Sequence, residues 1–574
     1  MINWFTWISL TIVFIFTGFI IYFYASKGTP MYVYVFVYLG YVLPFGLVAL
    51  IPYDIYLAIA EKTPEIKGQQ DILFIVWRVV YWTVFVLCWL ILPVIQEYEM
   101  AGEFSFMPRL RTAIYRHFRS LFLEAIAGLI CLIYLLVENE LTIDSLPIFL
   151  IVLSNCWGLF LVIVLLGYGL VAIPKSFWYA GKSSDYLKYL YVKATILDEG
   201  IIEVKYKLDD IIRLVNTASY KIQENSTLQR PLDILLSICP LEMLEHHRTM
   251  QTHESRDSTE QLGTLNEKRL IELHKELKKT ISEYKRSNCR WGQLVDETLL
   301  LEDIIASHNS QEKIIKSSVT SEKSGLFSIK REKSEWLWLT RVKPFLCRIL
   351  GIFFTFMSIL VILGETTLFL KYPIGLFPIM FEEDYGIIET QLLCLLPLLY
   401  ILLCTKFGLF NLKLPGWYGL YPHNQTDSSS MAWSAFYLAR LTAPLSYNFL
   451  LFLKIENTVF INFMKIIDIV PVVGKQFSTF FPLILIVFCA MNYFNIYGKF
   501  LNALGMNQLS FSGTYCEEKL KEGLQLMQRA RSERERNMGI QSIKAREGIL
   551  NYQMTKIEST RTDPRRPNLK NGYF

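Results

Sequence analysis

Residues 147–173 read PIFLIVLSNCWGLFLVIVLLGYGLVAI and contain no charged side chain. A helix needs about 20 mostly apolar residues to cross a bilayer, because about 30 Å of hydrocarbon is covered at about 1.5 Å per residue. This run is therefore long enough to cross a membrane as a helix. The composition agrees: 52% of the 574 residues are hydrophobic and 19% are charged, whereas soluble domains have about 25% charged residues. We expect an integral membrane protein.

Eight other segments have a similar length and apolar character. In chain order, the nine predicted spans are 3–24, 31–54, 72–95, 119–137, 147–173, 345–365, 387–405, 430–452 and 478–497. The first is too long for the core of a signal peptide and has no Lys or Arg ahead of it, so we expect it to be retained. The sequence thus predicts an all-α polytopic membrane protein with about nine transmembrane helices.

Composition divides the chain into four parts. Residues 1–173 are the N-terminal membrane part with five predicted spans, and residues 344–500 are the C-terminal membrane part with four. Between them, residues 174–343 form a polar insert that we expect to be cytosolic and helical. Residues 501–574 form a polar tail that we expect to be cytosolic and partly disordered.

Apolar residues of the insert recur at alternating steps of three and four, which is typical of a coiled-coil seam. The first seam consists of Leu187, Leu190, Ala194, Leu197, Ile201, Val204, Leu208, Ile211, Val215, Ala218 and Ile222. A second, weaker seam runs from Leu270 to Ile305. Both ends of the insert return to the same membrane face, so the sequence predicts a long antiparallel coiled coil. We expect this coiled coil to bind cytosolic proteins.

Basic residues in the connections indicate the orientation, because Lys and Arg accumulate on the cytoplasmic side. One face collects Lys27, Arg109, Arg111, Arg116, Arg119, Lys175, Lys182, Arg341, Lys343, Arg348, Lys406 and Lys413. The N-terminus is then extracellular or lumenal and the C-terminus cytosolic, in a plasma or endolysosomal membrane. The sequons at Asn225 and Asn424 should be unglycosylated in this orientation. Whether residues 458–473 form a short re-entrant or interfacial helix stays open, and a wrong assignment of this stretch would reverse the last span.

Several other classes of function are disfavoured by the sequence. The net charge of +5 is small and its basic residues are dispersed, so we expect no nucleic-acid binding. The ten Cys lie in apolar runs or in predicted cytosolic segments, so we expect no disulfides. His residues lack partners at ligand spacing, and no GxxxxGK[ST] motif occurs. We therefore expect no metal, no cofactor, no catalytic residue and no enzymatic activity.

One candidate pair of polar residues joins the second and third spans. An ionisable group at mid-depth costs about 2.5–3.5 kcal/mol, so each such group needs a partner or a water-lined cavity. Asp54 closes the second span, and Arg78 lies about two turns into the third. The two spans run antiparallel, which places the residues at similar depth. We favour a structural ion pair between them over a ligand site.

A second candidate site lies in the eighth span. Arg440 is close to the midplane, and Asn448 follows two turns later on nearly the same face. Pro444 lies between them and frees a backbone carbonyl. A broken, polar helix at this depth is typical of transporter sites, where Arg can hold an anionic group. Interhelical hydrogen bonding is the alternative that we favour, and a ligand-binding cavity lined by Arg440 and Asn448 stays open.

Several fragments resemble one family when they are taken together. They are LIPYDIYL (50–57), WRVVYW (77–82), NCWGLFLVIVLLGYGLVAIPKSFW (155–178), YPHNQTD (421–427) and RLTAPLSYNFL (440–450). With the order of five spans, insert and four spans, the chain resembles the limb-region-1-like membrane proteins, which include the lipocalin-interacting membrane receptor. It looks most like the branch called limb-region-1 domain-containing protein 2.

The resemblance implies nine spans, an N-terminus outside and receptor-like or trafficking roles. One branch takes part in lysosomal cobalamin export, and the branch that this chain resembles is linked to G-protein-coupled receptor signalling. Two functions remain: a receptor-like or scaffold protein with membrane receptors and cytosolic proteins as partners, or an exporter of a small organic solute. Deleting residues 183–308 should abolish the first, and Arg440→Ala should abolish the second.

Overall fold

A computed structural model describes much of the chain as helix. The described residues are 4–60, 64–137, 146–222, 227–249, 265–308, 313–315, 328–367, 375–381, 386–411, 419–455, 457–464, 483–496 and 517–536. Within these ranges there is no strand, and one isolated bridge joins Ala25 to Thr426. The predicted all-helical class is therefore confirmed for the described residues.

The N-terminal membrane part and residues 183–307 of the insert contain ten of the labelled helices. They are α1 (Trp4–Tyr24), α2 (Met31–Ile59), α3 (Pro64–Val86), α4 (Leu92–Met100), α5 (Phe106–Val137), α6 (Leu146–Ala180), α7 (Ser183–Lys221), α8 (Gln229–Ile238), α9 (Leu241–Thr249) and α11 (Glu267–Ser307). A π-helical turn over Leu87–Ile91 joins α3 to α4.

The second half of the chain contains eight further labelled helices. They are α12 (Ser328–Leu337), α13 (Lys343–Thr366), α14 (Leu376–Met380), α15 (Ile387–Asn411), α16 (Ser428–Arg440), α17 (Thr442–Phe452), α18 (Val459–Met464) and α20 (Ile484–Tyr493). Another π-helical turn over Trp338–Val342 joins α12 to α13. Residues 517–536, in the predicted tail, are also helical.

Six helices among the described residues are long and apolar enough to cross a membrane. They are Thr6–Tyr24, Met31–Ile59, Pro64–Met100, Trp157–Ala180, Glu332–Thr366 and Ile388–Asn411. Each overlaps one of the predicted spans. The predicted count of nine is not reached within the described residues. Most side chains of segment 119–137 and part of segment 478–497 lie outside them.

The predicted span 430–452 differs from the structure, which divides it into α16 and α17 at Leu441. These helices have 13 and 11 residues. Pro444 lies in the first turn of α17 and has no N–H to donate to the carbonyl of Arg440, four residues earlier. The helix is therefore interrupted beside Arg440.

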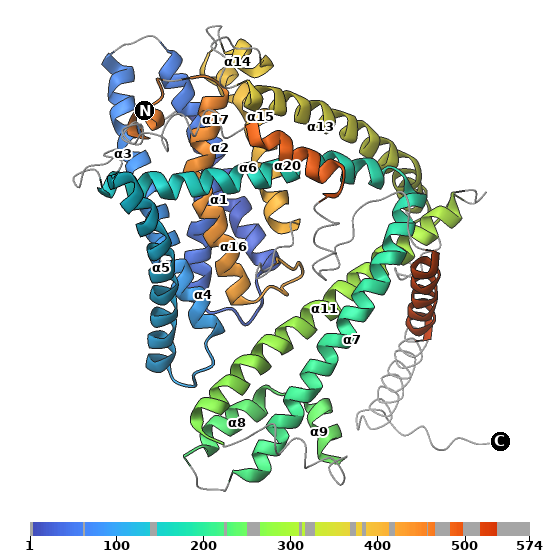
Figure 1. The fold of residues 1–574 in the computed structure, drawn as a ribbon. Coiled ribbons are helices and arrows are strands. Elements are labelled where there is room, and N and C mark those ends of the chain that lie inside the picture. The colour runs from blue at the N-terminus through green and yellow to red at the C-terminus, as the bar shows by residue number, and fades with distance from the viewer. Residues whose placement is uncertain are drawn as a thin grey trace, which may run out of the picture. The chain divides into compact units, whose positions relative to one another are not determined.

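The chain forms two compact units. The first comprises residues 1–181, 199–290 and 345–511, and contains the membrane helices α2, α6, α15, α16 and α17 (Figure 1). Its helices approach closely at small residues: a Cβ added at Gly169 would lie 2.1 Å from the carbonyl oxygen of Cys404. The backbones of α6 and α15 therefore touch, which a larger side chain would prevent.

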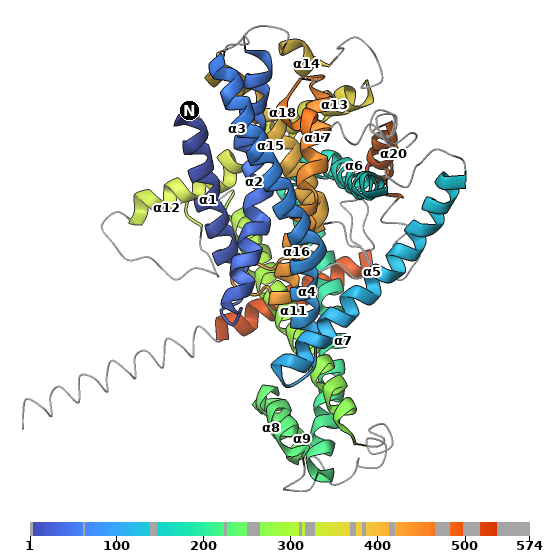
Figure 2. The ribbon, with the colours of Figure 1, turned by 90° about the vertical axis from the view of Figure 1, so that its left-hand side faces the viewer.

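Residues 199–290 of the first unit, here called the arm, contain parts of α7 and α11 lying side by side and antiparallel (Figure 1). Their shared core includes Leu208 and Val215 from α7 and Leu270 and Leu277 from α11, all predicted seam positions. Helices α8 and α9, which the sequence did not predict, pack on the same core near its end (Figure 2). The pairing of long helices is present, whereas their supercoiling stays a prediction.

The second unit comprises residues 182–198, 291–344 and 512–574. Met527, from the helix over 517–536, is buried in its core. Arg531 of the same helix donates to Glu302 at 2.7 Å and to Asp303 at 3.0 Å. Part of the predicted tail is therefore a helix that packs within this unit.

Candidate functional site

One stretch of α11 contacts two places in the membrane part of the first unit: the end of α4 with the turn that follows it, and the connection before α16. We call these contacts the arm junction. It comprises His274, Lys278, Arg286 and Arg290 of α11, Glu99 in the last turn of α4, Gly102 just after α4, and Tyr421 and Asp427 before α16. The arm junction is where the polar insert meets the membrane helices.

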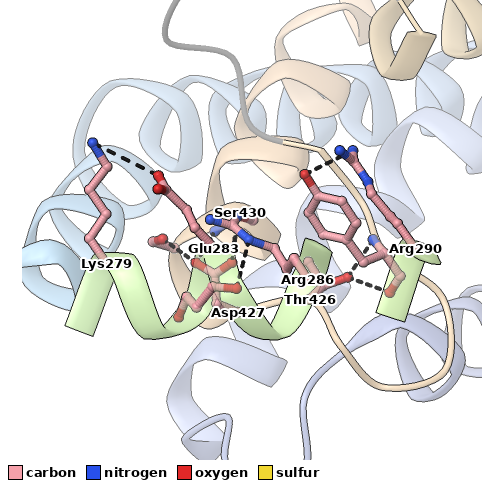
Figure 3. A network of polar contacts seen from close by, with 10 residues as sticks. Lys279, Glu283, Arg286, Arg290, Thr426, Asp427 and Ser430 are labelled. Atoms are coloured by element: carbon pink, nitrogen blue, oxygen red, sulfur yellow. Dashed lines mark hydrogen bonds and ion pairs between the residues drawn. The ribbon is translucent and has the colours of Figure 1, made fainter. Parts of the chain in front are cut away.

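Asp427 is the centre of one half of the arm junction. It is the N-cap of α16, and its carboxylate accepts hydrogen bonds from the Ser430 backbone N–H at 3.3 Å and the Ser430 hydroxyl at 2.8 Å. Arg286 reaches the same carboxylate at 3.2 Å (Figure 3). A carboxylate at a helix N-terminus is favourable because it satisfies free N–H groups and faces the positive end of the helix dipole. One side chain therefore both starts α16 and holds the arm.

Tyr421 strengthens the same contact. Its hydroxyl accepts a hydrogen bond from Arg290 at 3.0 Å. The guanidinium carbons of Arg290 and Arg286 lie 4.4 and 5.3 Å from its ring centroid, within the range of cation–π attraction. Two arginines one helical turn apart therefore both contact the ring of Tyr421.

The connection that carries Tyr421 and Asp427 is fixed to the end of α1. Asn424 donates its side-chain N–H groups to the carbonyls of Tyr22 at 2.6 Å and Ala25 at 3.0 Å. The Thr426 backbone N–H donates to Tyr24 at 3.0 Å. Both donated hydrogen bonds of the Asn424 side chain therefore hold this connection to the end of α1, and the absence of a glycan at the sequon stays a prediction.

The other half of the arm junction lies at the turn after α4. Lys278 donates to the Glu99 carbonyl at 2.7 Å, and His274 Nδ1 lies 2.6 Å from the carbonyl oxygen of Gly102. A Cβ at Gly102 would come within 2.3 Å of the Ile271 carbonyl oxygen, so the turn needs glycine. Burial lowers the pKa of His274, and the positive charge of Lys278 lowers it further. The hydrogen bond to the Gly102 carbonyl raises the pKa of His274, but burial outweighs it, so the docked position as a whole favours the neutral imidazole.

Asp54 has other partners than the predicted Arg78. Its buried carboxylate accepts hydrogen bonds from the backbone N–H groups of Val459 at 2.8 Å and Phe460 at 2.9 Å, and from the Trp77 indole at 3.1 Å. Arg78 is exposed, and its guanidinium lies 5.1 Å from the Phe74 ring centroid. Asp54 thus starts α18 and ties it to α2 and α3, within the stretch 458–473 that the sequence left open.

Arg440 and Asn448 are not brought to one site, because they contact different elements. The Arg440 guanidinium lies 5.1 Å from the Trp89 ring and 5.7 Å from the Phe436 ring. It lines a cavity of about 30 Å³ together with Cys88 and Trp89. Such a cavity has room for a water molecule. Asn448 instead donates to the Glu365 carboxylate of α13 at 2.6 Å.

Sequence reasoning missed Glu365, Trp77 and the arm junction. A signal existed for Glu365, because it is an ionisable residue inside the predicted span 345–365. Asp427 before a run of three serines is a recognisable helix start. Trp77 carried no such signal. No group of three or more His, Cys, Asp or Glu that could hold a metal ion occurs among the residues that the structure describes.

Comparison with known proteins agrees with this membrane architecture. The family model "LMBR1-like membrane protein" matches residues 2–497. The chain belongs to the LMBR1-like membrane protein family. Family membership and the apolar helices together show a multi-pass membrane protein. The resemblance predicted from the sequence is thereby confirmed.

Three relatives illustrate the branch. The chain is 28% identical over 525 residues to the Homo sapiens "G-protein coupled receptor-associated protein LMBRD2", covering 87% of this chain and 75% of that protein. It is 28% identical to the Danio rerio protein of that description, LMBRD2B, covering 81% and 69%. It is also 28% identical to the Dictyostelium discoideum "LMBR1 domain-containing protein 2 homolog B", covering 92% and 70%. No solved structure matches the chain.

Proposed function

We propose that this protein is a receptor-associated membrane adaptor. Its membrane helices associate with a G-protein-coupled receptor in the bilayer, and its arm recruits cytosolic proteins. The observation that carries the proposal is the similarity to relatives named as receptor-associated, over 81% and 87% of this chain. In this role the N-terminus is extracellular or lumenal and the C-terminus cytosolic, in a plasma or endolysosomal membrane.

The arm junction supports the adaptor role because it connects the membrane helices, which would bind the receptor, to the arm, which would bind cytosolic proteins. Asp427 is at once the N-cap of α16 and the partner of Arg286. A displacement of α16 by a neighbouring receptor would therefore move or release the arm. Hydrogen bonds to charged groups contribute about 1.5–3 kcal/mol, enough to shift a two-state equilibrium by about tenfold or more.

Charge reversal at the arm junction tests the adaptor role. Arg286→Glu places two negative charges together and should lower the recovery of cytosolic partners about tenfold in affinity capture of the full chain. Receptor recovery should stay unchanged, because the membrane helices are intact. Arg286→Lys keeps a positive charge opposite Asp427 and leaves the N-cap of α16 intact, so it should retain partner recovery.

The matched control is Arg269→Glu, since Arg269 pairs with Glu272 one turn away on the same helix. It should leave both recoveries unchanged. Failure of the unaltered protein to recover a receptor would contradict the proposal. Equal loss of partners in Arg269→Glu and Arg286→Glu would contradict the role of the arm junction.

The exporter alternative gains no support from these contacts. Arg440 and Asn448 contact different elements, and the cavity beside Arg440 is about 30 Å³. The names of the relatives describe receptor association. In the same capture experiment, Arg440→Ala should leave both recoveries unchanged.

A further inference from the structure

Two buried carboxyl groups in the membrane part differ in how their oxygens are satisfied. Asp54 is 0% exposed and accepts hydrogen bonds from three N–H donors, as an ionised carboxylate does. Glu365 is 1% exposed and has one donor, the side-chain amide of Asn448. The same chemical group therefore lies in two different environments.

The pair of Glu365 and Asn448 lacks one hydrogen-bond donor when Glu365 is ionised. Asn448 Nδ2 donates to Glu365 Oε1 at 2.6 Å. Glu365 Oε2 and Asn448 Oδ1 are both buried and have no hydrogen-bond partner in the structure. Both are acceptors when the carboxyl is ionised, so neither can satisfy the other.

A proton on Glu365 removes both deficits. A neutral carboxylic acid has one O–H donor, which Asn448 Oδ1 can accept. The two side chains then form an eight-membered ring of two hydrogen bonds, with each group donating once and accepting once. An unpaired buried charge costs far more than a neutral, hydrogen-bonded group. We infer that Glu365 binds a proton, and that Asn448 holds it in a proton-binding site between α13 and α17.

Among the residues that the structure describes, none provides an opposite charge for an ionised Glu365. Helix α14 has no ionisable side chain, and α17 has none except Tyr447. Gly364 packs so closely that an added Cβ would lie 2.2 Å from the Phe452 ring. Phe452 in turn packs against Phe377 of α14, with ring centroids 5.9 Å apart. The proton is therefore the charge that neutralises this carboxyl.

Infrared difference spectroscopy tests the site on the purified full chain in lipid nanodiscs. At about pH 7.5, where an ordinary glutamate is ionised, the unaltered protein should show a protonated carboxylic acid band. Glu365→Gln should remove that band. A spectrum without the band, or a band that persists in Glu365→Gln, would overturn the inference.

Thermal unfolding of two matched variants gives an independent test. Glu365→Gln supplies an amide N–H where the acid O–H would be, so the ring and the melting temperature should be retained. In Asp54→Asn, the amide N–H₂ replaces one acceptor oxygen and faces N–H groups that already donate to Asp54. The variant should therefore have a lower melting temperature. If Glu365→Gln is destabilised as strongly as Asp54→Asn, Glu365 is an anion like Asp54 and the inference fails.

Discussion

Asp54 shows how one side chain can organise three helices. Asp54→Ala leaves the N–H groups of Val459 and Phe460 and the indole of Trp77 without their acceptor. Each lost hydrogen bond to a charged group costs about 1.5–3 kcal/mol. We expect several kcal/mol of destabilisation, measured as a lower melting temperature in detergent.

Arg78→Ala is the control for Asp54→Ala. Its exposed guanidinium contacts the Phe74 ring, an interaction of about 0.5–1 kcal/mol. We expect a small change in melting temperature. Equal destabilisation by both substitutions would favour the ion pair predicted from the sequence over the contacts in the structure.

The sequence identified Asp54 as a residue that needs a partner. It predicted Arg78 as that partner, whereas the structure shows the adjacent Trp77 donating to Asp54. Trp77 and Arg78 are adjacent, and adjacent residues of a helix point about 100° apart. Depth along two antiparallel spans can be read from the sequence. The rotation of each helix about its axis depends on all its packing contacts, so the partner could not be read from the sequence.

At the scale of elements, the arm junction should respond to pH. The pKa of His274 is lowered by burial and by nearby positive charges. Below about pH 6.5, the usual pKa of histidine, the detached or unfolded state takes up a proton more readily than the docked state. The contribution of His274 to the stability of the docked state is therefore complete above that pH and is lost as the pH falls. Hydrogen exchange of residues 99–104, corrected for intrinsic rates, should increase between about pH 7.5 and pH 5.5.

A variant that cannot titrate separates His274 from other acid effects. Asn at this position keeps a side-chain N–H for the Gly102 carbonyl but has no proton to gain. His274→Asn should therefore exchange at the same corrected rate at both pH values. An unchanged pH dependence in His274→Asn would assign the effect to a group other than His274.

Elements were predicted well where their signal is local. The predicted seam positions Leu208, Val215, Leu270 and Leu277 are buried in the arm, because three-four periodicity places them on one helix face. The break between α16 and α17 was only hinted at by Pro444. Proline weakens a helix, but whether the chain bends there depends on what packs beside it.

At the scale of the whole molecule, contacts place several connections at one end of the membrane helices. Ser26 bonds to Thr426, Asp427 to Arg286, and Glu99 to Lys278. With the insert assigned to the cytosol, epitope tags placed beside Lys27 and His423 should be detected only after permeabilisation. For protein in the plasma membrane, a tag at the N-terminus should be detected on intact cells.

A tag at the C-terminus is the matched reference for this topology experiment. The predicted orientation puts the C-terminus on the same side of the membrane as Lys27. Detection of the Lys27 or His423 tags on intact cells would reverse the orientation deduced from the basic residues. Glycan attached to Asn424 would have the same consequence.

The sequence by itself determined the membrane class, the helical architecture, the family and the polar insert. These properties follow from the lengths of the apolar segments, from hydrophobic periodicity and from short characteristic sequence fragments. Each of these signals is contained within a short segment. Only the tertiary structure decided that Asp54 starts α18, that Asp427 holds the arm and that Glu365 meets Asn448. These partners are 405, 141 and 83 residues apart in the chain. Their contacts depend on how whole helices pack and rotate, which no local pattern encodes.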